Sequence, residues 1–257
     1  MKEEVKERLK SSGAACLVLS LSGYTDAGGV ASFSSSFMVR KLRAVRLGEL
    51  EGGGFVLSSS RPTTVIKRGL VEEVRYPRSE VFLAATGRGV VVVRGEEPHF
   101  SWNSFLNEVL ELVEASGVEE VYTLGGLIDV VEEPKVSAVV SLPELQSLVE
   151  ACGAELIDYE GPCSIYTALV ECCASRRLKA VSLWGHVPYN RYTALSQLRA
   201  PDLETSHRTL RVLCRLAEIE LPLAELEDEA RKQLSFLEGM KAAEGERRTS
   251  KFSNYIY

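Results

Sequence analysis

Short apolar runs that recur along the chain are the feature that most constrains its fold. The clearest of them occupy residues 14–21, 118–124 and 179–183. Runs of this length, rich in Val and Leu, are typical of strands buried on both faces of a sheet. Stretches with helical patterns lie between them, for example residues 101–115 and 143–151. The alternation predicts an α/β fold in which helices sandwich a mostly parallel sheet.

Composition divides the chain into three parts. We expect an α/β core domain over residues 1–202, a length that can bury a sizeable core. Residues 203–240 have helical patterns only, and the last helix is expected to end near residue 239. We expect residues 241–257 to be a mobile tail, because residues 241–251 are polar and lack a hydrophobic face.

The balance of charge limits the partners. The 257 residues include 36 Asp and Glu against 30 Lys and Arg, which gives a formal net charge of −6. Nucleic acid and anionic membranes require a concentrated basic face, so neither is expected as a partner. No apolar run approaches the roughly 18 residues of a membrane span, and residues 1–10 lack the apolar region of a signal peptide. We therefore expect a cytoplasmic protein.

No pattern typical of a metal or cofactor site is present in the sequence. The six cysteines form no C-x-x-C pair and the three histidines are scattered, so no zinc site is expected. Most cysteines lie in apolar surroundings, where cysteine behaves as a small core residue; occasional disulfide pairing is the alternative. The glycine turn at residues 23–29, G-Y-T-D-A-G-G, matches neither nucleotide-binding glycine pattern. We expect neither a metal nor a cofactor.

Glycine-rich and acidic loops follow several of the predicted strands. Ligands gather at the carboxyl ends of parallel strands, so these loops can meet at one edge of the sheet. The candidate pocket residues are Gly23, Asp26, Glu97, Gly125, Gly126, Glu160 and His186. In one interpretation they line a small-molecule pocket; in the other, the glycines permit turns and the polar groups cap helices, with Thr25 or Asp26 as an N-cap. The sequence has no G-x-S-x-G elbow, and no catalytic residue is assigned.

The last seven residues, K-F-S-N-Y-I-Y, depart from the polar stretch before them. Three aromatic side chains and an isoleucine are costly to leave in water. They can pack on the chain's own surface or on a sister subunit. Alternatively, Tyr255, Ile256 and Tyr257 bind a pocket of another protein, in which basic residues or backbone amides hold the carboxylate.

Four motifs, taken in order, carry a resemblance to a known family. They are G-Y-T-D-A-G-G-V-A-S at residues 23–32, L-G-G at 124–126, Y-E-G-P-C-S-I-Y at 159–166 and V-S-L-W-G-H-V-P-Y at 181–189. With R-A-P at residues 199–201, they resemble the archaeal branch of the proteasome assembly chaperone family, of the chaperone-two type. The resemblance covers roughly residues 14–240. It implies an α/β sandwich related to nucleoside-phosphorylase-like folds, homo-oligomeric assembly and no established catalytic residues.

The resemblance also bears on activity and on the C-terminal residues. Some family members carry an ATP-grasp label, which no nucleotide-binding lysine pair or metal-binding acidic pattern supports here. Some archaeal members are thought to assist proteasome assembly through a C-terminal hydrophobic–tyrosine–any tripeptide. In this chain the penultimate residue is Ile256, and tyrosines occupy positions 255 and 257. The motif is therefore similar in kind but shifted by one residue.

Two hypotheses about function follow from these observations. The leading one is a non-enzymatic, homo-oligomeric assembly chaperone or interaction protein, with proteasome subunits as candidate partners and the C-terminal tail as the docking element. The alternative is a small-molecule enzyme with a nucleoside-phosphorylase-like or ligase-like pocket, formed by the loops at the sheet edge.

Overall fold

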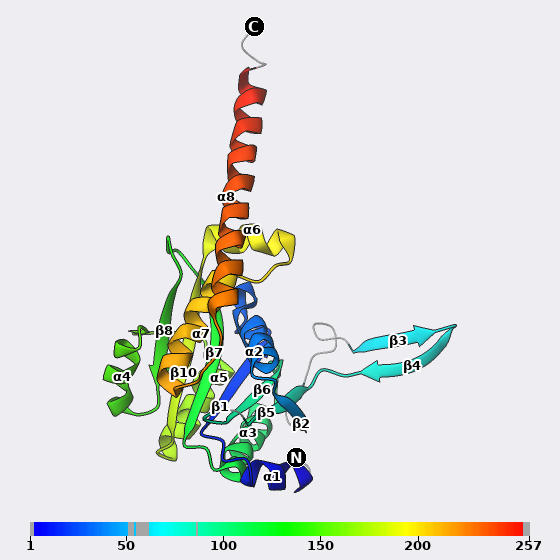
Figure 1. The fold of residues 1–257 in the computed structure, drawn as a ribbon, viewed down its shortest axis with the longest axis vertical. Helices are drawn as coiled ribbons and strands as arrows, with labels where there is room; N and C mark the ends of the chain where they lie inside the picture. Colours follow the sequence, from blue (N-terminus) through cyan, green and yellow to red (C-terminus); the bar gives the residue numbers. More distant parts are fainter. Residues whose placement is uncertain (1–2, 51–53, 55–61, 86, 254–257) are drawn as a thin grey trace.

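An eight-stranded sheet forms the centre of the computed structural model (Figure 1), which describes residues 3–50, 54, 62–85 and 87–253. The strand order is β2-β5-β6-β1-β7-β10-β8-β9, and β6, β1, β7 and β10 are parallel neighbours. The strands are β1 (Cys16–Ser22), β2 (Val45–Leu50), β5 (Ser79–Ala84), β6 (Val90–Glu96), β7 (Glu120–Asp129), β8 (Lys135–Val140), β9 (Glu155–Leu156) and β10 (Lys179–Pro188). The predicted α/β class with a mostly parallel central sheet is confirmed.

Helices cover both faces of the sheet. One face carries α2 (Val30–Lys41), α4 (Gln146–Ala151) and α7 (Leu203–Ala217), and the other carries α1 (Glu3–Lys10), α3 (Trp102–Ser116) and α5 (Ile165–Ser175). The two layers of helices explain why the sequence of β1 is apolar without interruption. Cys16 and Val18 pack into the first layer, whereas Leu17, Leu19 and Leu21 pack into the second. Burial on both faces removes the polar alternation of a half-exposed strand.

Several local predictions are confirmed. Strands β5 and β6 form the antiparallel hairpin expected around residues 87–89. Gly117 ends α3 in the left-handed conformation, with a φ of 66°. A second hairpin, between β3 (Thr63–Lys67) and β4 (Leu70–Arg75), occupies part of the segment expected to be irregular or hairpin-like. These features depend on local sequence, and so the sequence predicts them well.

Other predictions were wrong at the carboxyl edge of the sheet. The sequence pattern ends two strands at Leu124 and Leu183, but β7 and β10 each continue for five further residues, to Asp129 and Pro188. Strand β8 and helix α6 (Tyr189–Leu198) were not predicted at all. Strand β8 pairs antiparallel with β10, and no local sequence pattern predicts this long-range contact.

Helix α8 (Ala224–Ser253) is longer than expected and extends away from the body of the molecule (Figure 1). Its expected end near residue 239 was wrong. Residues 240–250 read M-K-A-A-E-G-E-R-R-T-S. They are rich in helix-forming residues even though they lack an apolar face. Over the described ranges, none of the helices combines the length and apolarity needed to cross a bilayer.

The six cysteines are free thiols, and we predict that they react at very different rates. Burial raises the pKa of Cys16 and of Cys173 to about 12, so almost none of either is thiolate near neutral pH. Cys163 is exposed. In the folded protein, a thiol reagent should therefore modify Cys163 first, and Cys16 and Cys173 only on unfolding. Cys163→Ser should remove the fastest phase; if that phase persists unchanged, the assignment is wrong.

Candidate functional site

The chain segments that follow β1 and β6 lie together and form the centre of the site. The Glu97 backbone N–H donates to the Ser22 carbonyl at 2.8 Å, and Glu97 Oε2 accepts from the Thr25 N–H at 3.2 Å. Glu97 is only 7% exposed, and burial raises the pKa of its carboxyl. Gly23 has a φ of +124°, and a Cβ there would lie 3.3 Å from the Glu97 Cβ. The structure thus brings Gly23 and Glu97 together.

Asp26 and Gly126 form a second pair beside Thr25. Asp26 Oδ1 accepts from the N–H groups of Ala31 at 2.7 Å and Ser32 at 3.1 Å, in the first turn of α2. The residue before α2 is Gly29, which has no side chain to cap the helix, so Asp26 fills this role as one interpretation predicted. Burial raises the pKa of the Asp26 carboxyl. The Gly126 N–H donates to the Thr25 carbonyl at 2.8 Å.

Tyr166 is a buried part of this centre that sequence reasoning missed. Its hydroxyl accepts a hydrogen bond from the Leu21 N–H at 2.6 Å, across 145 residues of sequence, and its ring packs on Trp184 with centroids 5.7 Å apart. Thr25 and Tyr166 are both fully buried. Burial raises the pKa of the Tyr166 hydroxyl, which therefore stays protonated. Only its place in Y-E-G-P-C-S-I-Y hinted at a special role.

The glycines of β7 and β10 allow helices to approach the sheet closely. A Cβ at Gly126 would lie 2.3 Å from the Ala27 carbonyl oxygen, and one at Gly185 would lie 2.7 Å from Thr205 Cγ2. A Cβ at Gly125 would meet the Trp184 ring at 2.8 Å. Atoms of the chain itself therefore occupy the space that these glycines leave. Gly125 and Gly126 lie within a strand and serve close packing.

His186 lies inside β10 and joins three neighbouring strands. Its Nδ1 is 2.7 Å from Asp129 Oδ2, and its Nε2 is 2.7 Å from Ser137 Oγ. The hydrogen bond from His186 holds the pKa of Asp129 below its usual range. The order Ser–His–Asp is that of a hydrolase triad, but Ser137 is fully buried in the middle of β8. The chain of hydrogen bonds therefore fastens β7 and β8 to β10.

A cavity of about 470 Å³ adjoins the pair of residues described first, Gly23 and Glu97. Gly23 and Glu97 line it together with Tyr24, Trp102 and Cys163. Of the seven predicted pocket residues, only these two are among its lining residues. Glu160 is exposed in the segment between β9 and α5. Within the described part of the chain, no group of three or more His, Cys, Asp or Glu side chains is placed to hold a metal ion.

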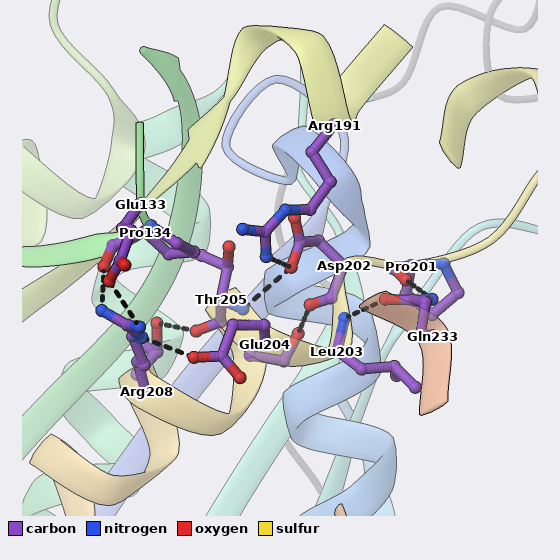
Figure 2. A network of polar contacts seen from close by, with 12 residues as sticks. Glu133, Pro134, Arg191, Pro201, Asp202, Leu203, Glu204, Thr205, Arg208 and Gln233 are labelled. Atoms are coloured by element: carbon purple, nitrogen blue, oxygen red, sulfur yellow. Dashed lines mark hydrogen bonds and ion pairs between the residues drawn. The ribbon is translucent and has the colours of Figure 1, made fainter. Parts of the chain in front are cut away.

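The junction between α6, α7 and α8 is a further polar centre (Figure 2). Asp202 is fully buried, and its Oδ1 caps α7 by accepting from the Thr205 N–H at 2.9 Å. Arg191 Nη1, from α6, lies 3.4 Å from the same oxygen. Gln233, on α8, donates to the Pro201 carbonyl at 2.8 Å and accepts from the Leu203 N–H at 3.1 Å. These contacts fix α8 to the segment that begins α7.

Arg208 extends this junction toward the loop between β7 and β8. Its guanidinium pairs with Glu204 at 2.6 Å and with Glu133 at 3.1 Å, and donates to the Pro134 carbonyl at 2.7 Å (Figure 2). Sequence reasoning missed Asp202 and Arg208, because neither lies in a glycine-rich loop. The R-A-P-D run at residues 199–202 was the available signal, since Asp before a helical pattern is a favoured cap.

Large apolar side chains are exposed at the carboxyl edge of neighbouring strands. Tyr24 follows β1, Val130 follows β7 and Tyr189 follows β10, and each is more than half exposed. Phe236, on α8, is also exposed. Exposed apolar groups gathered at one edge of a protein are typical of a surface that contacts another protein. The edge predicted to hold a small-molecule pocket thus also presents exposed apolar side chains.

The residues predicted at the C-terminus, Tyr255, Ile256 and Tyr257, lie outside the described residues. The structure does show what precedes them, since α8 runs to Ser253. The direction of this helix, away from the sheet, is plain in Figure 1.

Comparison with known proteins identifies the family. A crystal structure of a PAC2 family protein from Streptomyces avermitilis is 28% identical, with a TM-score of 0.77 over 88% of this chain and 95% of that one. A Mycobacterium tuberculosis proteasome-assembly chaperone homologue is 22% identical, with a TM-score of 0.77 over 87% and 94%. A Pyrococcus furiosus archaeal proteasome activator is 17% identical, with a TM-score of 0.67 over 88% and 93%.

These relatives come from bacteria as well as archaea, so the likeness is not confined to the archaeal branch. The curated proteins include no match to the chain. The model of the PAC2 family matches residues 20–241, which is most of the sequence. The resemblance inferred from the sequence motifs is therefore confirmed, and the chain belongs to the PAC2 family.

Proposed function

We propose that the protein is a cytoplasmic, non-enzymatic assembly chaperone that acts as a homo-oligomer and docks on proteasome subunits through Tyr255, Ile256 and Tyr257. The observation that carries the proposal is the single helix α8, which leaves the body of the molecule (Figure 1) and ends at Ser253, two residues before Tyr255 in the sequence. A docking peptide needs to reach a pocket on a large partner, and a helix provides both reach and direction.

The first half of α8 is the anchored part. Leu226, Ala230 and Leu237 are buried, at a spacing that places them on one face of the helix, and Gln233 makes the two hydrogen bonds to the start of α7. The sixteen residues from 238 to 253 continue the helix beyond this anchor. At about 1.5 Å per residue, they span about 24 Å. Because α8 is anchored in this way, its end at Ser253 has a defined place, which lowers the entropy lost when the residues after it dock.

The polar groups at the sheet edge support a chaperone more than an enzyme. Asp26 is engaged in capping α2, Glu97 accepts from the Thr25 backbone, and His186 lies between Asp129 and Ser137. Each of these groups therefore already has partners in its own chain. The exposed apolar side chains at the same edge, by contrast, are available to another protein.

The test is recovery of proteasome α-subunits by the immobilised protein. We expect the full chain to recover them and a variant lacking residues 252–257 to recover none, because the deletion removes the docking residues and leaves the anchored half of α8 intact. Asp228→Ala, an exposed change on α8, is the matched control and should recover as much as the full chain. Equal recovery by the full chain and the deletion variant, or none by either, rules out the tail model.

The shifted tyrosine register can be examined in the same assay. The double change Tyr255→Ile and Ile256→Tyr restores the hydrophobic–tyrosine–any order without altering composition. If the tail docks in the register of the family tripeptide, this variant should recover more α-subunit than the full chain does. Weaker recovery would show that the docking site binds the natural order of residues 255 and 256 better than the exchanged one.

A further inference from the structure

The loops that follow β1 and β6 leave the sheet toward opposite faces, and a cavity lies between them. Strands β1 and β6 are parallel neighbours, with Ser22 opposite Glu96 at their carboxyl ends. The chain continues from β1 into α2 on one face and from β6 into α3 on the other. Open α/β sheets bind their ligands at such a switch point. The cavity of about 470 Å³ is lined by residues of both loops, and its volume is in the range of small-molecule sites.

The charges on the wall of this cavity favour a cation. Glu96 and Glu97 line it, and no Lys or Arg is among its nine lining residues in the described part of the chain. A larger cavity next to it does contain arginines, but each of them is paired with a glutamate that lines that cavity too. An anionic ligand would therefore be repelled. Because no group of the described side chains is placed to hold a metal ion, the cation is an organic one.

Glu97 supplies a fixed carboxylate on this wall. It is only 7% exposed, and burial raises the pKa of its carboxyl, an effect that backbone hydrogen bonds from Thr25, Ile165 and Tyr24 oppose. A carboxylate accepts hydrogen bonds at both oxygens, so these bonds fix its position without neutralising its charge. A buried charge with no opposite charge beside it is costly, and an organic cation in the cavity offsets that cost.

Trp102 and Tyr24 add aromatic surface to the same cavity. The Trp102 indole N–H donates to the Pro98 carbonyl at 2.8 Å, and the ring packs against the core on the face of the sheet that carries α3. The ring is therefore held in place before a ligand binds. Tyr24 is 71% exposed and lines the cavity from the other loop. Aromatic rings are typical surroundings of bound ammonium groups, because the face of a ring attracts a cation.

We propose that this cavity binds a small organic ammonium ion, whose charged group is held by the carboxylate of Glu97 and by the rings of Trp102 and Tyr24. Binding makes and breaks no covalent bond, so the site is compatible with a non-enzymatic protein. The inference goes beyond the proposed docking function and does not depend on it, because the site uses none of the residues from 252 to 257.

The test is calorimetric titration of the full-length protein with two ammonium ions and their uncharged analogues. Choline is compared with dimethylbutanol, and putrescine with butanediol, so that each pair has a similar shape and differs in charge. We expect at least one of the two cations to bind at least about tenfold more tightly than its analogue, because the ring faces and the carboxylate act on charge alone. Added salt should weaken this binding. Binding of neither cation, or equal binding of each cation and its analogue, overturns the proposal.

Substitutions at two exposed tyrosines locate the site. Tyr24→Ser removes a ring from the cavity, and we expect it to weaken binding of the cation about threefold or more, as for a cation–ring contact at an exposed site. Tyr189→Ser is the matched control, because Tyr189 is 62% exposed, begins α6 and is not among the lining residues. This variant should bind as the natural chain does. Equal effects of the two substitutions overturn the proposal.

Glu97→Gln tests the charge of the site. Glutamine keeps an oxygen that can accept from the Thr25 N–H, so the melting temperature shows whether the fold is kept. We expect this variant to bind the cation at least about tenfold more weakly. If it does not fold, the comparison of the two tyrosine variants still decides. A Tyr24→Ser protein that recovers less proteasome α-subunit, while the natural chain binds neither ammonium ion, also overturns the proposal, because a side chain of the partner would then occupy the cavity.

Discussion

Replacing Asp202 with alanine is expected to lower the free energy of unfolding by about 3 kcal/mol, the low end of the cost of breaking a buried ion pair. Asp202 is fully buried, and its Oδ1 both caps α7 and faces Arg191. The substitution removes the cap, which costs about 1 kcal/mol by itself. It also leaves the Arg191 guanidinium, whose side chain is 12% exposed, without its carboxylate.

We expect the low end of the cost of breaking a buried ion pair because the contact between Arg191 and Asp202 is long. The Arg191 Nη1 to Asp202 Oδ1 distance is 3.4 Å, and the second oxygen, Oδ2, has no hydrogen-bond partner among the described residues. A chain of this length loses about 2–4 °C in melting temperature per kcal/mol, so the expected fall is about 6–12 °C. Thermal and urea denaturation followed by circular dichroism measure both quantities.

Two further variants separate the cap from the charge. Asp202→Asn keeps an oxygen that can cap α7 but has no charge, so it should lose less than the alanine variant does. Asp228→Ala removes an exposed aspartate that pairs with Arg231 on α8, and should change the stability by no more than about 0.5 kcal/mol. A stability of Asp202→Ala within that same margin of the natural chain would contradict the role assigned to this residue.

The sequence predicted the fold where local pattern decides it. The uninterrupted apolar run of β1 identified a strand buried on both faces, and Gly117 marked the end of α3. Prediction from the sequence failed where a long-range contact decides the structure. Gly126 and Gly185 look like loop residues in isolation, but in the fold they lie within β7 and β10, where the absence of a side chain leaves room for α2 and α7 against these strands. A glycine that permits close packing cannot be distinguished from one that permits a turn until the neighbouring element is known.

Predictions about the candidate site divide in the same way, into those set by local sequence and those set by long-range contacts. Gly23, Asp26, Glu97 and Gly126 were predicted to gather at the carboxyl edge, and the structure arranges them as two pairs around Thr25. Their predicted meeting with Glu160 and His186 depended on where distant loops lie, which the sequence does not specify. Tyr166 and Asp202 were missed for a related reason: their roles depend on Leu21 and Arg191, residues that contact them only in the folded chain.

The second large effect is expected for Gly126→Ala. A Cβ at this position would lie 2.3 Å from the carbonyl oxygen of Ala27 and 3.0 Å from Val30 Cβ, distances at which atoms must move. Ala27 belongs to the turn that enters α2, and this turn is fixed by the Asp26 side chain and by the Gly126 N–H bond to Thr25. It cannot shift without breaking these contacts. We therefore expect a loss of about 2–3 kcal/mol, toward the upper part of the usual range for overpacking.

Gly239→Ala is the matched control for this change. Gly239 lies in α8, an added Cβ there would meet no atom within 4 Å beyond the backbone of its own helix, and its φ is not in the left-handed region. Alanine should stabilise the helix there by about 0.5–1 kcal/mol, because it restricts the unfolded chain and favours helix. The same substitution is thus expected to lower the free energy of unfolding at Gly126 and to raise it at Gly239. Urea denaturation of both variants measures the contrast, and a Gly126→Ala protein as stable as the natural chain would show that the turn before α2 moves freely. That result would remove the close approach of α2 to β7 as the reason for glycine at this position.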